Sequence, residues 1–141
     1  MFCGGTTAEG WACYATDLME EIGFLDPLQR LSQDHSRLRM AARAVVDVRL
    51  HRGEWTLEQA AACYRDRAGM SPEAARAEAV KNSMFPGAAL MYLIGTQAIH
   101  DLRREIAART TGFALQDFHD RFLSYGSVPV ALIARAMRVE G

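Results

Sequence analysis

The chain has 141 residues, a length typical of one domain, and a formal net charge of -1 at neutral pH. Half of its residues are hydrophobic, which is too many for a disordered chain and enough for a core. The near-neutral charge gives no electrostatic basis for binding nucleic acid, so we expect no such partner. The longest apolar run, 88–95, is far shorter than the roughly 20 residues that span a membrane. We therefore expect no membrane partner.

The first ten residues, MFCGGTTAEG, lack the basic region and the apolar region of a signal peptide. This favours a cytoplasmic location for the chain as given. Cys3, Cys13 and Cys63 are odd in number and form no C-x-x-C pair. That pattern argues against a disulfide framework and against a structural zinc site made by cysteines.

Apolar residues recur at three- and four-residue steps along most of the chain, a spacing typical of helices. The first predicted helix covers 9–23 and begins at or just after Glu9. The second covers 27–52, with an apolar stripe at Leu38, Ala41, Val45 and Val48. Because three- and four-residue steps follow one helical face, we expect this stripe to face the core.

Start and stop signals divide the rest of the chain into further helices. A capping box at 56–59 predicts a helix to about residue 67, and Ser71 followed by Pro72 predicts another start. The Pro86–Gly87 pair precedes a long helix to about Arg109, with a stripe that includes Ile94, Leu102 and Ile106. Shorter helices follow at about 115–124 and after 126–129. The predicted fold is all-α: one domain, 1–141, forming an irregular bundle of about six or seven helices.

Glu9 has two interpretations. An acid at the start of a helix is stabilised by the helix dipole by about 0.3–1 kcal/mol, and this alone would explain it. Alternatively, Glu9 is a metal-binding carboxylate on a rigid helix, beside Trp11 and Tyr14. Nothing in its local sequence decides between the two.

A polar stripe runs along the second helix at Arg39, Arg43, Asp47 and His51, which are four residues apart. It is either a solvated face with ordinary ion pairs, or a site in which Asp47 orients the His51 imidazole. The apolar stripe lies on another face, so the polar stripe should meet water, a cleft or another chain.

Tyr92 lies in the most apolar part of the chain, PGAALMYLIG. Its phenol is either a core group with one hydrogen-bond partner, or a donor to a developing oxyanion. His100 is followed by Asp101, Arg103 and Arg104, a pattern that indicates a solvated helix face. No motif of a known active site is complete in the sequence.

Four blocks of the sequence carry a resemblance to a known family. They are AEGWACYATDLMEEIGF, RAVVDVRLHRGEWTLEQA, EAVKNSMFPGAALMYLIGTQAIHDLR and FALQDFHDRFLSYGSVPVALIARAM, in this order and over nearly the whole chain. The chain resembles the C-terminal part of the bacterial DUF885 family, a domain of unknown function predicted to comprise zinc peptidases of the gluzincin type.

The resemblance implies roles for several residues. In such peptidases, a His-Glu…Pro-Gly-His-His segment supplies two zinc ligands and the general base, and a glutamate from a later helix supplies the third ligand. Glu9 matches that glutamate, and Tyr92 matches a tyrosine that could stabilise the tetrahedral intermediate. His51 is a candidate to contact the substrate or to support the site, with Asp47 and Arg43 beside it.

No His-Glu pair occurs in the 141 residues. We therefore expect this chain alone to bind no zinc tightly and to be inactive, since catalytic zinc needs about three protein ligands. One hypothesis is that it is the C-terminal portion of a zinc-dependent peptidase that acts on peptide substrates once completed. The other is a non-catalytic helical interaction module, which self-associates as a dimer through the surface that a missing half would cover.

Overall fold

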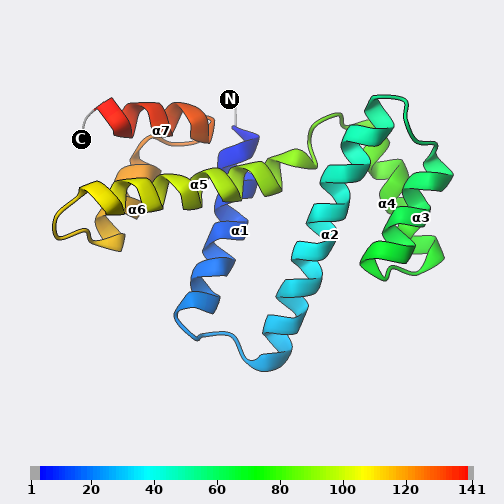
Figure 1. The fold of residues 1–141 in the computed structure, drawn as a ribbon, viewed down its shortest axis with the longest axis horizontal. Coiled ribbons are helices and arrows are strands. Elements are labelled where there is room, and N and C mark those ends of the chain that lie inside the picture. The colour runs from blue at the N-terminus through cyan, green and yellow to red at the C-terminus, as the bar shows by residue number, and fades with distance from the viewer. Residues whose placement is uncertain (1–3, 140–141) are drawn as a thin grey trace.

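The computed structural model describes residues 4–139, and this part of the chain is all-α, as predicted (Figure 1). Seven helices are present in it: α1 Gly5–Glu21, α2 Pro27–His51, α3 Leu57–Ala68, α4 Pro72–Met84, α5 Leu90–Arg109, α6 Leu115–Ser124 and α7 Val130–Val139. Six of the predicted starts lie within three residues of the observed ones, because local capping and turn signals mark those boundaries.

The helix starts confirm the capping signals. The Thr56 side chain accepts from the Gln59 backbone N–H, and the Gln59 side chain accepts from the Thr56 N–H, completing the predicted capping box of α3. The Ser71 hydroxyl accepts from the Ala74 backbone N–H and so caps α4, with Pro72 at the first helical position. A second capping box, between Asp26 and Gln29, starts α2.

The predicted start of the first helix was wrong. α1 begins at Gly5, so Glu9 lies one full turn inside it, and its first turn carries no acid. The helix continues towards the N-terminus because Gly4 donates a backbone hydrogen bond to the Ser127 carbonyl. An explanation of Glu9 by the helix dipole therefore loses its basis, since that effect falls off beyond the first turn.

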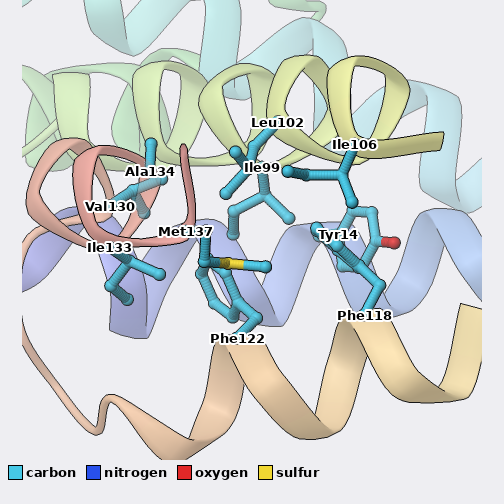
Figure 2. Packing of buried hydrophobic residues seen from close by; sticks show 10 residues of the cluster. All are labelled: Tyr14, Ile99, Leu102, Ile106, Phe118, Phe122, Val130, Ile133, Ala134 and Met137. Carbon is cyan, nitrogen blue, oxygen red and sulfur yellow. The ribbon is translucent and has the colours of Figure 1, made fainter. Parts of the chain in front are cut away.

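One hydrophobic core forms where α1, α5, α6 and α7 meet (Figure 2). Its ten buried members are Tyr14, Ile99, Leu102, Ile106, Phe118, Phe122, Val130, Ile133, Ala134 and Met137. Trp11 packs against this core and stacks on Phe122. The core fixes the C-terminal half of α5 against α1.

A second core lies between α2, α3 and α4, at the opposite end of the molecule in Figure 1. It is built mainly of alanines around Val46 and Tyr64, both fully buried. The predicted apolar stripe of α2 does not face this core: Leu38 and Val45 are 48% and 49% exposed. Alanine side chains admit close helix packing, so the small face of α2 turns inward and the large apolar face turns outward.

Two glycines set the crossing of α1 and α5, the two helices that cross near the N-terminus in Figure 1. A Cβ on Gly10 would lie 2.6 Å from the Gly95 Cα, and a Cβ on Gly95 would lie 2.9 Å from the Gly10 Cα. The two backbones touch at this point, because neither residue has a side chain to separate them. The contact fixes which residues on either side of the crossing become neighbours.

Within residues 4–139, no helix combines the length and the apolar character needed to cross a membrane. Cys13 and Cys63 are both free thiols. Cys3, the third cysteine of the sequence analysis, lies outside the described residues.

Candidate functional site

The crossing of α1 and α5 brings Glu9 and Tyr92 together. Glu9 precedes Gly10 on α1, and Tyr92 lies one turn before Gly95 on α5. Burial raises the pKa of the Tyr92 phenol, and the negative charge of Glu9 raises it further. The phenol therefore stays protonated and available as a hydrogen-bond donor beside a carboxylate.

Arg43 joins this pair from α2. Its guanidinium carbon lies 5.8 Å from the centroid of the Tyr92 ring, a cation–π geometry. The same guanidinium forms an ion pair with Glu78 on α4, and both side chains are largely buried. Asn82 donates to the Arg43 carbonyl at 3.0 Å and to the Tyr64 hydroxyl at 2.9 Å. Arg43 is thus held from two sides, and three of the predicted site residues come together here.

Asp47 lies one turn further along α2 and is only 2% exposed. Its carboxylate accepts from the backbone N–H groups of Gly87 at 2.9 Å and Ala89 at 3.1 Å, and from Nδ1 of His51 at 2.8 Å. The polar stripe of α2 therefore faces the protein at Arg43 and Asp47, whereas His51 lies at its exposed end. Asp47 fixes the loop that leads into α5, and so fixes the position of Tyr92.

His51 is held at both ring nitrogens. Nδ1 bonds to Asp47, and Nε2 lies 3.3 Å from the Ser83 carbonyl, which can only accept. Both nitrogens donate when both bonds are made, so the ring is then an imidazolium. Burial lowers the pKa of His51, but the hydrogen bonds to Asp47 and Ser83 outweigh it, and the net pKa is raised.

His51 lies eight residues beyond Arg43 on α2, which is about 12 Å along the helix axis at about 1.5 Å per residue. Its partners all belong to α2 and α4. The arrangement brings Asp47 and His51 together, as the four-residue spacing predicted, but as a clamp on the α4–α5 connection. The assignment of His51 as a catalytic group stays a prediction.

A cavity of about 390 Å³ opens between α1, α2 and α5, and Tyr92 lies on its wall. The surface that lines it is mainly apolar. Its lining residues are Ala12, Cys13, Thr16, Asp17, Gln33, Arg37, Met40, Tyr92, Leu93, Thr96, Gln97 and His100. Burial raises the pKa of the Cys13 thiol, so this cysteine is present in its neutral form.

One end of the cavity carries an ion-pair network centred on Asp17. Asp17 accepts from Nε2 of His100 at 2.8 Å and from Arg37 at 2.7 Å, and Arg37 also binds Glu20 at 2.6 Å. The prediction that His100 lies on a solvated face was wrong, since its side chain is three-quarters buried. No local signal could have found this pair, because 83 residues separate its members.

Glu9 offers one carboxylate in a position that Tyr92 and Arg43 help to define. Among residues 4–139, no group of three or more His, Cys, Asp or Glu side chains could hold a metal ion. Glu9 alone could fill at most one ligand position of a zinc shell, so the other ligands of such a shell would have to come from residues outside those described.

The fold and the site define an all-α protein in which an open, mainly apolar cavity adjoins a carboxylate–phenol pair. The chain belongs to DUF885, a family described as bacterial proteins of unknown function, which it matches over residues 1–137. No match is found among curated proteins.

Two solved structures are similar in sequence and fold, and both are described as putative lipoproteins. The one from Shewanella oneidensis, described as of unknown function, is 32% identical with a TM-score of 0.86, and the match covers 96% of this chain and 26% of that chain. The one from Colwellia psychrerythraea is 36% identical with a TM-score of 0.88, covering 93% and 23%. This chain therefore spans about a quarter of the length of these two relatives.

Proposed function

We propose that this chain is the C-terminal helical portion of a zinc-dependent peptidase, which hydrolyses peptide bonds when the His-Glu…Pro-Gly-His-His segment completes it. The observation that carries the proposal is the contact between Glu9 and Tyr92 at the α1–α5 crossing. These are the two positions that the family resemblance assigns to a zinc ligand and an oxyanion donor. They lie 83 positions apart in the sequence, and the fold brings them to one place beside a cavity.

Each residue of the candidate site would have a separate role in peptide hydrolysis. Bound zinc would polarise the peptide carbonyl and activate a water molecule. Glu9 would supply one oxygen ligand. Tyr92, kept protonated by its surroundings, would donate a hydrogen bond to the carbonyl oxygen as negative charge develops there. Arg43 would hold the Tyr92 ring, and Asp47 would hold the loop that carries it.

The isolated chain provides the first test. We expect purified chain to contain far less than one zinc per molecule by elemental analysis, and to cleave no peptides from a mixed library. Stoichiometric zinc together with cleavage would contradict the proposal that this chain is incomplete.

The second test uses a full-length family member that contains both the His-Glu segment and the four blocks. Substitution of the residue matching Glu9 by Gln should lower zinc content, because an amide is a weaker ligand than a carboxylate. Substitution of the residue matching Tyr92 by Phe should leave zinc bound and lower kcat by about 10²–10³, the usual cost of one oxyanion donor. Unchanged zinc content in the first variant would remove Glu9 from the ligand set.

A second candidate function, a non-catalytic interaction module, is favoured by the outward face of α2. Leu28, Leu31, Leu38 and Val45 are large, apolar and at least 48% exposed. Exposed apolar surface of this kind marks association sites. In this function the chain would form a dimer through α2.

Light scattering after size-exclusion chromatography tests this alternative. The double substitution Leu38→Lys and Val45→Lys should convert a dimer to a monomer, whereas Leu132→Lys on α7, at a leucine that is also exposed, should not. A monomeric wild-type chain at all accessible concentrations would exclude the self-associating module.

A further inference from the structure

The cavity between α1, α2 and α5 has the size of a ligand site. Its volume of about 390 Å³ falls within the range of roughly 300–1,000 Å³ that small-molecule pockets occupy. Its walls include the methyl group of Ala12 and the side chains of Met40 and Leu93, the last of them 47% exposed. An exposed leucine on the wall of an open cavity leaves apolar surface that a ligand could cover.

The polar side chains on the wall already have partners within the protein. Asp17 and Arg37 neutralise each other, with His100 and Glu20 completing the network. Thr16 donates to the Ala12 carbonyl at 3.1 Å.

The polar side chains on the part of the wall nearer Tyr92 also have partners within the protein. Thr96 donates to the Tyr92 carbonyl at 2.7 Å, and Gln97 donates to Asp101 at 2.8 Å. The thiol of Cys13 is directed to the sulfur of Met40 at 3.5 Å. A charged ligand would find no unpaired counter-charge among these groups, whereas a neutral apolar group would displace only water.

We propose that this cavity receives an uncharged apolar side chain, aliphatic or aromatic, of the peptide whose carbonyl group lies at Tyr92. The assignment rests on the proposed function, because Tyr92 is shared between the cavity wall and the Glu9 pair. It deepens that function by naming a substrate preference: a hydrophobic residue adjacent to the scissile bond.

Nuclear magnetic resonance on the isotope-labelled chain tests the cavity directly. N-acetyl-leucine amide should shift the backbone amide signals of Ala12, Thr16, Leu93 and Gln97 in a saturable manner. N-acetyl-aspartate amide, of similar size but charged, should bind at least fivefold more weakly. Absence of saturable shifts at these residues, or equal binding of the two probes, would overturn the assignment.

Two cavity variants and two matched controls locate the binding. Ala12→Phe fills the cavity from an exposed position of α1, and Leu93→Asp places a charge on its wall, so each should weaken the leucine probe at least fivefold. Ala131→Phe and Leu132→Asp make the same changes at exposed positions of α7 and should leave binding unchanged. Equal losses of probe binding in the control variants would show that the probe does not bind in this cavity.

The experiment needs neither zinc nor the upstream segment, so its failure is distinct from failure of the proposed function. Zinc binding and cleavage in a full-length family member, without binding of the leucine probe here, would overturn the cavity assignment alone. Binding of the probe here, with no zinc and no cleavage in the full-length protein, would overturn the peptidase and with it the substrate role of the cavity.

Discussion

Gly10 of α1 and Gly95 of α5 are in direct backbone contact. A Cβ added to Gly95 would come within 2.2 Å of the Thr6 carbonyl oxygen, which no real side chain tolerates. Thr96, next to Gly95, also lies within 3.4 Å of the Gly10 carbonyl. Because Glu9 and Tyr92 flank this contact, the candidate site depends on the absence of two side chains.

Gly95→Ala should therefore destabilise the protein strongly. Overpacking usually costs about 1–3 kcal/mol, and a clash with rigid backbone should reach the upper end of that range. Urea denaturation followed by circular dichroism measures the change. Gly5→Ala is the matched control, since its Cβ would meet only the flexible Met91 side chain. Equal stability of the two variants would contradict the close crossing.

Asp47→Asn should loosen the connection between α4 and α5. The amide cannot accept from all three donors, so at least one buried N–H loses its partner, at a cost of about 1–3 kcal/mol. Hydrogen exchange should show faster exchange at the Gly87 and Ala89 amides. Asp101→Asn, an exposed partner of Arg104, should change stability by less than about 1 kcal/mol. Unchanged protection at both Gly87 and Ala89 would show that Asp47 does not hold the loop.

His51 should make the protein less stable as the pH rises. Its pKa in the folded state is raised above the ordinary value of 6.5, so folding favours the protonated ring. That contribution is complete below about pH 6.5 and is lost as the pH rises through the folded pKa. Thermal unfolding of wild type and His51→Gln between pH 5 and 9 measures it. The difference between the two proteins should shrink with rising pH, and a constant difference would contradict the clamp.

His119 should make the protein less stable as the pH falls, the opposite of the effect of His51. Burial and the charge of Arg103 lower its pKa below 6.5, so folding favours the neutral ring. Its Nε2 lies 2.9 Å from the buried Tyr14 hydroxyl, and only a neutral ring can accept a hydrogen bond there. Its contribution is present above pH 6.5 and is lost as the pH falls through the folded pKa. His119→Gln, which retains an acceptor but does not titrate, should flatten the loss of stability in acid; an identical acid profile would argue against this pair.

Glu9→Gln should lower the pKa of Tyr92. Burial would keep this pKa above its ordinary value of 10.0, but the part due to the Glu9 charge would vanish. Carbon NMR of tyrosine rings across an alkaline titration measures the change. Glu73→Gln, an exposed acid in the first turn of α4, serves as the control and should have no effect on Tyr92. A Tyr92 pKa that did not respond to Glu9→Gln would separate the two residues of the candidate site.

Local signals in the sequence were sufficient to predict the helical class and six of the seven helix starts. The capping box at Thr56 and the Ser71–Pro72 start act within one turn, so their effect does not depend on distant residues. The start of α1 was missed because Gly5 begins that helix without a side-chain cap, and its preceding residue is anchored by Ser127 from the far end of the chain. Periodicity also failed for α2, since the neighbours Val45 and Val46 lie about 100° apart around the helix and only packing decides which is buried.

The sequence by itself determined the helical class, most helix boundaries, the family, and the pairing of Asp47 with His51, because each rests on short-range spacing or on shared motifs. Only the tertiary structure decided that Glu9 meets Tyr92, that Arg43 covers the phenol ring, and that Asp17 binds His100. These pairs are up to 83 residues apart. Their contact depends on how closely two backbones approach at Gly10 and Gly95, a property of helix packing that no local pattern encodes.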